Sequence, residues 1–226
     1  MKIFFWNCQG NLRAKIQLLK SINADLFVIA ECENPETTAS EEYKKWAINH
    51  IWTGLIPYKG LAIIANSQIK LEACDWPDYL FRNYLPARIN DNITLLAIWA
   101  KNPYIEDINK YLAVYWNYIN NNTVIIGDFN SNIIWDKKHD FRNHSYLNQK
   151  LSEKGLFSIY HTLHQVIFGK ENQPTFFMHH NLNKPYHIDY CYCSKLIMKS
   201  CEILSTEKWH KASDHNPIIV ELNLPY

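Results

Sequence analysis

The sequence predicts an α/β fold in which two β-sheets pack together and helices lie outside them. Apolar, β-branched runs of strand length begin at residues 2, 25 and 123, and segments with helical periodicity lie between such runs. A series of short strand-like segments also fills residues 50–99. The chain of 226 residues is 47% hydrophobic and 20% charged, so it can bury a large core. We therefore expect a single domain over residues 1–226.

The N-terminal part of the chain predicts a strand, a helix and a second strand. Residues 2–8 and 25–30 are the two strands, and apolar side chains recur at helical spacing over residues 11–22. A crossover helix of this kind joins parallel neighbours. Because parallel strands carry their ends to the same edge of a sheet, we expect Asn7 and Glu31 to lie side by side.

The middle of the chain predicts short strands and one long helix. A short helix is expected near residues 40–48. Five strand-like segments with turn residues between them predict an antiparallel meander: residues 50–55, 60–66, 69–75, 84–90 and 93–99. Pro103 then opens an amphipathic helix that keeps its apolar spacing to Ile119, and three asparagines at 120–122 end it.

Residues 123–132 form the stretch around which the rest of the chain is arranged. Four apolar or β-branched residues predict a buried strand that Gly127 ends, and Asp128 and Asn130 follow at alternate positions. Residues two apart in an extended chain point the same way, so both side chains would enter one cleft at the end of the strand, where α/β sheets bind ligands. The same composition is also typical of an Asx turn, and this stretch alone does not decide between the two.

The last third of the chain predicts one helix, over residues 143–154, and several strands. Five strand-like segments follow the helix: residues 156–160, 175–178, 186–192, 196–204 and 217–224. In the last of them, apolar residues alternate with Glu221 and Asn223, which indicates one solvent-exposed face.

Charge and cysteine content narrow the class of protein. The net charge is +1, so no field over the whole molecule attracts nucleic acid, although a groove can still be locally basic. The six cysteines form no Cys-x-x-Cys pair, and Cys191 and Cys193 lack the second pair that a zinc site needs. Free thiols favour a reducing compartment, so we expect a cytoplasmic protein. No run approaches the ~20 apolar residues of a membrane helix, and the N-terminal apolar run is too short for a signal peptide.

Polar side chains end several of the predicted strands. They are Asn7, Glu31, Asp128, Asn130, Asp189, Asp214 and His215. Taken singly, each is typical of a solvated loop or a turn, but their repetition at the ends of separate buried strands indicates a common site. Carboxylate and amide oxygens are hard ligands that suit Mg²⁺ or Mn²⁺ and suit zinc poorly.

Six short motifs that contain these residues occur in order: Trp6-Asn7, Glu31, Gly127-Asp128-Phe129-Asn130, Pro174-Thr175-Phe176, His187-Ile188-Asp189-Tyr190 and Ser213-Asp214-His215-Asn216-Pro217. Together they resemble the endonuclease/exonuclease/phosphatase superfamily over the whole chain, and the ordered set is specific although each motif is short. The resemblance implies a four-layered α/β sandwich, with two packed mixed β-sheets flanked by helices. It also implies cleavage of phosphate esters by in-line attack of water.

The resemblance implies roles for the residues that would hold a metal ion and the attacking water. Glu31 would be the principal ligand of Mg²⁺ or Mn²⁺, helped by Asn7 and Asp214. Asp128 would position or deprotonate the attacking water. Asn130 would hold the phosphate or that water.

The resemblance also implies that Asp189 and His215 act as a pair. His215 would donate a hydrogen bond to a phosphoryl oxygen or take part in proton transfer, and Asp189 would hold its imidazole in one tautomer. Elementary chemistry supports this pairing, because a carboxylate behind an imidazole orients the ring and raises its basicity.

One position departs from the family. After the strand at 93–98 the family usually places a His or Tyr that contacts the scissile phosphate, and here Trp99 follows that strand. An indole donates one hydrogen bond but does not exchange a proton near neutral pH. Trp99, Lys101 and Arg142 are the candidates for substrate contact. The alternatives are core packing, which is favoured for Trp99, and solvated surface charge for Lys101 and Arg142.

The expected function is that of a metal-dependent nuclease, acting as an endonuclease on DNA, and the sequence identifies no membrane or protein partner. Several basic residues after Asn130 favour a nucleic-acid substrate. A phosphoesterase on a small or lipid phosphate is the alternative that the near-neutral charge keeps open. Its inositol-phosphatase branch carries Cys-Asp-Arg where this chain has residues 187–190, which counts against that branch. A catalytically silent binding module is suggested only by Trp99 and is disfavoured by the complete set of acids with His215.

Overall fold

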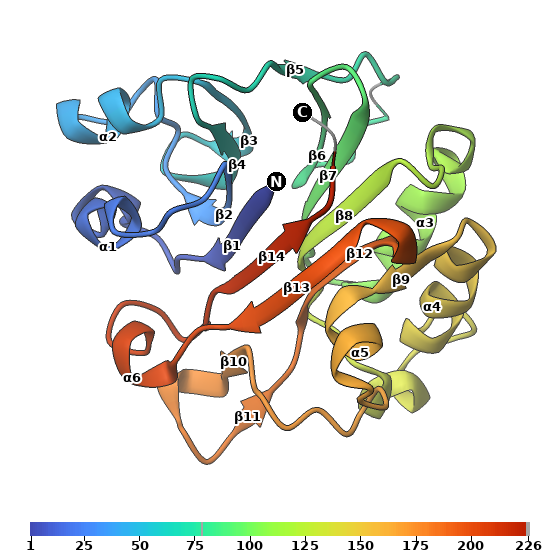
Figure 1. Ribbon diagram of the computed structural model, residues 1–226. Helices are drawn as coiled ribbons and strands as arrows, with labels where there is room; N and C mark the ends of the chain where they lie inside the picture. The colour runs from blue at the N-terminus through green and yellow to red at the C-terminus, as the bar shows by residue number, and fades with distance from the viewer. Residues whose placement is uncertain (78, 225–226) are drawn as a thin grey trace.

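Two six-stranded sheets form the centre of the molecule in the computed structural model, which describes residues 1–77 and 79–224 (Figure 1). The first sheet has the order β13 (Met198–Ile203), β14 (Ile218–Leu222), β1 (Lys2–Asn7), β2 (Leu26–Cys32), β4 (Lys59–Ala65) and β3 (His50–Ile56). The second sheet has the order β5 (Leu71–Ala73), β6 (Tyr84–Ile89), β7 (Ile93–Trp99), β8 (Thr123–Asp128), β12 (Asp189–Ser194) and β9 (Leu156–Ser158). A short ribbon pairs β10 (Phe176–Phe177) with β11 (Pro185–Tyr186).

Apolar side chains from the facing sides of the two sheets form the central core. Val28 and Ile63 of the first sheet and Leu95 and Ile126 of the second have no exposed surface in this core. Burying one such aliphatic side chain contributes about 1.5–3 kcal/mol. Because successive strand residues point to opposite faces, every second residue of the central strands is left to pack outward.

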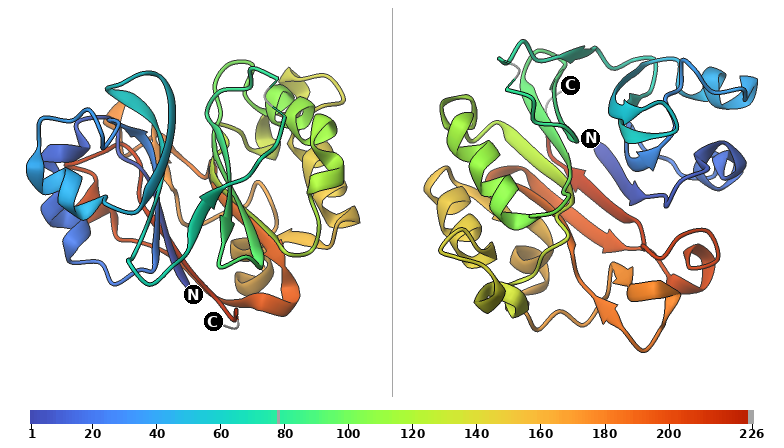
Figure 2. Two further views of the ribbon diagram at one scale, coloured as in Figure 1. Left: turned by 90° about the horizontal axis from the view of Figure 1, so that it is seen from above. Right: turned by 180° about the vertical axis from the view of Figure 1, so that it is seen from behind.

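Helices pack on these outward faces and complete four layers (Figures 1 and 2). The first sheet carries α1 (Ile16–Lys20), α2 (Glu41–Trp46) and α6 (Thr206–Trp209) with the 3₁₀ turn η1 (Leu12–Ala14), and the second carries α3 (Ile105–Val114) and α4 (His144–Glu153). The remaining elements are α5 (Ile159–His164), beside β12 and β13, and the 3₁₀ turns η2 (Trp116–Tyr118), η3 (Ile133–Lys138), η4 (Met178–His180) and η5 (Lys195–Ile197). The predicted α/β sandwich of two mixed, helix-flanked sheets is confirmed.

The predicted parallel pairing at the N-terminus is also confirmed. β1 and β2 are parallel neighbours, and Asn7 pairs in register with Ala30, which places it beside Glu31. The meander predicted for residues 50–99 is antiparallel but not continuous. β3 and β4 belong to the first sheet, whereas β5, β6 and β7 belong to the second, because the chain crosses between the sheets after β4.

Several predicted boundaries were wrong, including that of the helix predicted to run to Ile119, since α3 ends at Val114. Gly127 does not end its strand: β8 continues to Asp128, and glycine is required because a Cβ there would lie 2.0 Å from the carbonyl oxygen of Ile98. The strand predicted at 156–160 ends at Ser158, where α5 begins, and the strand predicted at 186–192 is interrupted between β11 and β12. Helices as short as α5 and α6 are stabilised by tertiary packing, which local sequence patterns do not report.

None of the helices formed by the described residues has both the length and the apolar character needed to cross a bilayer.

Candidate active site

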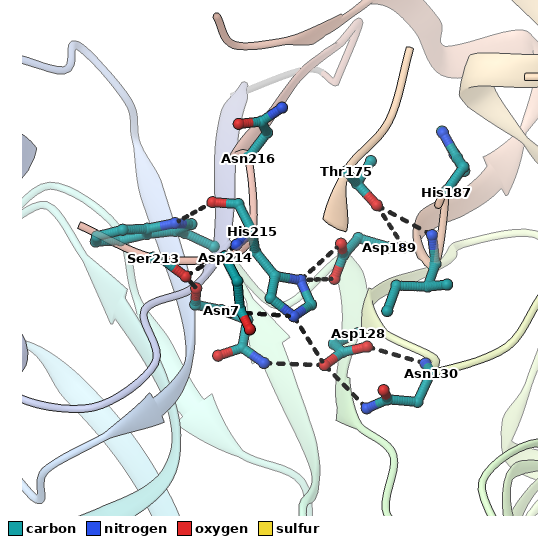
Figure 3. Close-up of polar contacts among 12 residues, drawn as sticks. Asn7, Asp128, Asn130, Thr175, His187, Asp189, Ser213, Asp214, His215 and Asn216 are labelled. Carbon is teal, nitrogen blue, oxygen red and sulfur yellow. Dashed lines mark hydrogen bonds and ion pairs between the residues drawn. The ribbon is translucent and has the colours of Figure 1, made fainter. Parts of the chain in front are cut away.

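Polar side chains from both sheets meet at the rim where the parallel strands end (Figure 3). Asn7 is the last residue of β1, and its Nδ2 donates to Oδ2 of Asp128 at 2.9 Å and to Oε1 of Glu31 at 3.3 Å. Asp128 is the last residue of β8 in the opposite sheet. Asn7 therefore joins the two sheets at this rim, and the predicted neighbours Asn7 and Glu31 do lie together.

Asp128 is held by the turn that follows its strand. The backbone N–H of Asn130 donates to Oδ1 of Asp128 at 2.9 Å, and its Nδ2 donates to Oδ2 at 3.1 Å. Nδ2 of Asn130 also donates to the carbonyl of Ala100, and Asn130 adopts a left-handed φ of 47°. The Asx turn is thus present, and it orients a carboxylate that is 1% exposed among the polar side chains at the rim.

A second carboxylate lies directly across the strand pair from Asp128. Asp189 of β12 pairs in register with Asp128, and like charges at opposed positions destabilise a sheet. The imidazole of His215 lies between them: its Nδ1 is 2.9 Å from Oδ2 of Asp189, and its Nε2 is 3.9 Å from Oδ2 of Asp128 (Figure 3). Since a carboxylate accepts, Nδ1 carries a proton and Nε2 faces Asp128.

Burial and neighbouring charge shift the pKa values of both groups. Burial, followed by the charge of Asp189, raises the pKa of Asp128 to about 7. Burial lowers the pKa of His215, but the carboxylates of Asp189 and Asp128 outweigh it and raise that pKa to about 9. Perturbed carboxyl and imidazole groups in contact are typical of functional sites, because ordinary packing gives no reason to place them together.

Thr175 fixes Asp189 from behind. Its hydroxyl accepts from the backbone N–H groups of Ile188 at 3.0 Å and Asp189 at 3.1 Å, and Thr175 has no exposed surface. The backbone carbonyl of Thr175 accepts from the N–H of Asn216 at 2.8 Å. Thr175 therefore connects the segment of Asp189 to the segment of His215.

Two further side chains fix His215 against β1. The hydroxyl of Ser213 donates to the carbonyl of Asn7 at 2.7 Å and accepts from the N–H of His215 at 3.0 Å. Nε1 of Trp6 donates to the carbonyl of His215 at 3.0 Å. Both the backbone N–H and the backbone carbonyl of His215 are thus hydrogen-bonded, which fixes the position of its imidazole.

Glu31 and Asp214 border the same centre and are more accessible. Oε2 of Glu31 lies 2.8 Å from Nζ of Lys59, and Glu31 adopts a left-handed φ of 62° that is unusual for a non-glycine residue. Oδ1 of Asp214 lies 4.0 Å from Nε2 of His215. The carboxylates of Glu31 and Asp214 are oxygen ligands of the kind that a hard divalent cation prefers, and the amide oxygen of Asn7, which accepts from the N–H of Gln9 at 3.1 Å, is a third.

The three candidates for substrate contact are not equivalent. Trp99 pairs in register with Asp128 but is only 4% exposed. It packs in the core between the sheets, which was the alternative that the sequence favoured for this residue. Nζ of Lys101 lies 4.0 Å from the centre of the Trp99 ring, at the edge of the site. Arg142 pairs with Asp140, and its carbonyl accepts from Asn109 of α3, so the structure does not bring it into the polar cluster.

The sequence matches one family model over residues 4–215, that of the Endonuclease/Exonuclease/phosphatase family. The chain therefore belongs to this family, as the ordered motifs predicted. No protein in the curated collection that was searched matches the sequence.

Solved structures with the same fold come from several organisms. A variant of the 3′ phosphatase NExo from Neisseria, bound to a product DNA hairpin, is 18% identical, with a TM-score of 0.73 and coverage of 99% of this chain and 100% of the other. An AP endonuclease from Archaeoglobus fulgidus is 16% identical, with a TM-score of 0.76 and the same coverage. The endonuclease domain of TRAS1, a telomere-specific non-LTR retrotransposon, is 16% identical, with a TM-score of 0.68 and coverage of 99% and 98%. These likenesses establish the shared fold.

Lys59, Thr175 and Ser213 received no role from the sequence, although Thr175 and Ser213 lie inside the motifs. Their part in the site depends on contacts between segments that are far apart in the chain, such as the bond from Ser213 to Asn7. For Thr175 and Ser213 the only sequence signal was their place in those motifs, and Lys59 lies outside them.

Proposed function

We propose that this protein is a divalent-metal-dependent phosphodiester hydrolase that cleaves DNA as an endonuclease, through in-line attack of an activated water. One observation carries the proposal: Asp128, Asp189 and His215 converge in a buried cluster whose ligand atoms all lie within 4.8 Å of one another, beside Asn7 and Glu31. Membership of a family that includes DNA nucleases and 3′ phosphatases supports it.

Glu31, Asn7 and Asp214 would hold the metal ion in this proposal. Bound there, a divalent cation would neutralise charge on the phosphoryl oxygens and stabilise the leaving alkoxide. The tighter cluster of Asp128, Asp189 and His215 is a weaker metal site, because both oxygens of Asp189 already lie within hydrogen-bonding distance of Nδ1 of His215. We therefore propose that those three side chains orient the attacking water and transfer or hold protons, rather than bind the metal ion.

Asp128 and His215 divide the proton chemistry. Asp128 would orient the attacking water and accept its proton, since a carboxyl with a pKa of about 7 exchanges a proton near neutral pH. Nε2 of His215 would donate to a phosphoryl oxygen, while Asp189 keeps the other ring nitrogen protonated. Asn130, bonded to both oxygens of Asp128, would hold the phosphate or the water beside it.

DNA is the proposed substrate because lysines border the site and because the NExo relative was solved with a DNA hairpin. Lys101 and Lys59 lie 4.0 and 5.7 Å from the centre of the Trp99 ring, so two ammonium groups flank the position from which the family usually contacts the phosphate. Trp99 would support Lys101 rather than touch the phosphate itself. Arg142 would contact the DNA backbone only at a distance from the reacting atoms.

A phosphate monoester on a nucleotide or a small molecule is the second candidate substrate. Its support is the modest positive charge at the rim, where the ammonium of Lys59 is already paired with Glu31. We place the protein in the cytoplasm, because its six cysteines are all unpaired.

Nicking of supercoiled plasmid tests the proposal. The assay compares Mg²⁺, Mn²⁺ and a chelator, beside hydrolysis of inositol phosphates, nucleotides and a 3′-phosphorylated oligonucleotide. We expect nicking that the chelator abolishes. Hydrolysis of the monoesters without nicking would favour the second candidate, and activity unchanged by the chelator would overturn the role of the metal.

A further inference from the structure

A cavity of about 350 Å³ opens beside the active site, between the loop after β8 and the ribbon of β10 and β11. Its walls include the rings of Phe177 and Tyr186 and the exposed side chain of Leu182, and its polar lining includes Glu171 and His187. Its volume is at the lower end of the range for small-molecule sites. None of the polar residues in this cavity has a part in the chemistry proposed above.

Glu171 is a buried carboxylate that uses only one of its oxygens for the surrounding protein. Its side chain is 6% exposed, and Oε1 accepts from Nε2 of His161 at 3.0 Å, from the N–H of Gly169 at 2.9 Å and from Nδ2 of Asn132 at 3.2 Å. Across residues 1–77 and 79–224, no other residue is placed to donate to Oε2. Oε2 is therefore the oxygen of this carboxylate that is available to a ligand in the cavity.

His187 presents a second unused acceptor. It is 4% exposed, and its Nδ1 donates to the carbonyl of Gln173 at 3.0 Å. That bond places the proton of the neutral ring on Nδ1, so Nε2 carries a lone pair. Nε2 is buried and has no hydrogen-bond partner within the described part of the chain. Two residues that line one cavity thus each have an acceptor not used by the rest of the described chain, and that of His187 is buried.

The cavity is built on the same segments as the catalytic groups. His187 precedes Asp189 by two residues, a separation of about 7 Å along an extended chain. The N–H of Phe177 donates to the carbonyl of Asp214 at 2.8 Å, and the ring of Phe176 lies 4.7 Å from that of His215. A group bound in the cavity would thus belong to a nucleotide next to the phosphate being cleaved.

We propose that this cavity receives a nucleobase of the DNA and binds its exocyclic amino group through Glu171 and His187. The proposal rests on the proposed function for the identity of the substrate. Aromatic walls suit a planar ring, and the ring of Tyr186 is itself supported by Trp135 at a centroid distance of 5.1 Å. Two acceptors suit an exocyclic amino group with its two N–H donors, so adenine, cytosine and guanine fit, whereas thymine offers only its single N3–H and fits poorly.

Binding of free deoxynucleosides tests the cavity without any cleavage. Deoxyadenosine, deoxycytidine, deoxyguanosine and thymidine are titrated against the whole protein and followed by NMR. We expect the three amino-bearing nucleosides to bind at least about tenfold more tightly than thymidine, because thymidine leaves one of the two acceptors unpaired. Equal binding of all four, or no binding, would overturn the proposal whether or not the protein cleaves DNA.

Glu171→Gln is the sharpest variant. Three donors converge on Oε1, so the amide oxygen takes that position and the amide nitrogen replaces Oε2, which turns an acceptor into a donor. The preference for amino-bearing bases should then disappear or reverse towards thymidine. Glu153→Gln, on the exposed end of α4, is the matched control. If Glu171→Gln fails to fold, Leu182→Trp replaces it as the test. The larger side chain fills the cavity from its exposed wall and should abolish nucleoside binding.

Mapping of cleavage sites on DNA of mixed sequence separates the two proposals. Cleavage with the same base preference in the parent and in folded Glu171→Gln would overturn the base pocket and leave the nuclease intact. Selective nucleoside binding without cleavage of any DNA would overturn the nuclease and leave the pocket.

Discussion

Asn7 and Asp128 are separated by 121 positions in the sequence, and Nδ2 of Asn7 donates a 2.9 Å hydrogen bond to Oδ2 of Asp128. Asn7 ends β1 in one sheet and Asp128 ends β8 in the other, so this bond spans the sandwich at its rim. The polar cluster therefore exists only when the two sheets are packed against each other, and loss of packing should remove activity before secondary structure is lost.

Asp128→Asn should lower the rate of nicking by about 10²–10⁴-fold, because an amide cannot accept the proton of the attacking water. The change keeps the size of the side chain, and its one oxygen can still accept from Nδ2 of Asn7 and Nδ2 of Asn130, although the N–H of Asn130 loses its acceptor. The initial rate in the plasmid assay is the measurement. Asp91→Asn, which removes an exposed partner of Lys70, should nick like the parent. A folded Asp128→Asn protein with parental activity would show that the water is activated elsewhere.

The polar residues at the strand ends could be predicted because strands have a simple local signature. A run of apolar residues followed by Asn7, Glu31 or Asp128 marks the strand and places its end to within one residue. The partnership of Asp189 with His215 came only from the family resemblance, since nothing local relates residues 26 positions apart. The local sequence thus predicts which polar residue lies at the end of each strand, but not which residue of another strand it contacts.

Features that depend on packing between elements could not be predicted. Gly127 looks like a strand breaker, and only the approach of Ile98 shows that it is a required strand residue. Glu171 looks like an ordinary loop residue and His187 like a residue of the predicted strand 186–192. Their unused acceptors become visible only once Gly169, Asn132 and the cavity are placed around them. The sequence alone contains no local pattern that reports these contacts.

Thr175→Val should reduce kcat by about tenfold with little change in KM, because it removes the acceptor for the N–H groups of Ile188 and Asp189 and lets the Asp189–His215 pair move. Two buried donors without an acceptor should also lower the free energy of unfolding by about 1–3 kcal/mol. Thr175→Ser keeps the hydroxyl and should restore kcat. Steady-state kinetics beside urea unfolding separate the two effects. Equal kcat values for the Val and Ser variants would show that Thr175 only packs.

Lys101→Ala should weaken DNA binding and lower the slope of log K against log salt by about one, because one ammonium contact to a phosphate is lost. Lys195→Ala is a matched control. Its Nζ lies 4.2 Å from the centre of the Phe157 ring, as that of Lys101 lies 4.0 Å from Trp99, but Lys195 follows the end of β12 opposite to Asp189. Fluorescence anisotropy of a labelled duplex at several salt concentrations is the measurement. Identical slopes for the two variants would show that Lys101 makes no contact with the DNA phosphates and is an ordinary solvated lysine.

Gly127→Ala should destabilise the protein by about 3 kcal/mol, because the new Cβ would lie 2.0 Å from the carbonyl oxygen of Ile98 and would push β7 and β8 apart. Gly155→Ala is the comparison: no atom lies within 4 Å of its Cβ, and only its left-handed φ of 73° costs about 1–2 kcal/mol. Urea unfolding measures both. A smaller loss for Gly127→Ala than for Gly155→Ala would contradict the close approach of the two strands.

The buried imidazole of His144 should make one part of the stability depend on pH. Burial, followed by the nearby charge of His161, lowers the pKa of His144 to about 3. In the neutral ring, Nε2 donates to the hydroxyl of Tyr192 at 3.1 Å, because that hydroxyl donates its own proton to Asn148. A lowered folded-state pKa means stability that is present above the unfolded pKa of about 6.5 and is lost as the pH falls below it.

Other groups titrate in or near the same range, so a variant must isolate His144. Protonation of Asp128 and of His215 favours the folded state, because both have raised pKa values, and this opposes the loss at His144 as the pH falls. Burial raises the pKa of Glu171, but hydrogen bonds from His161 and Gly169 outweigh it and lower that pKa to about 2, so Glu171 loses its contribution only at lower pH.

His144→Gln removes the titrating group and should change the pH dependence in a defined way. Between pH 7.5 and pH 5.5, the free energy of unfolding of the parent should fall by about 1.4 kcal/mol relative to that of His144→Gln, since the unfolded parent takes up a proton that the folded parent does not. Urea unfolding at both pH values measures this difference. His179→Gln, at an exposed histidine, should show no such change. A parent and His144→Gln whose stabilities fall in parallel would mean that His144 is protonated in the folded protein.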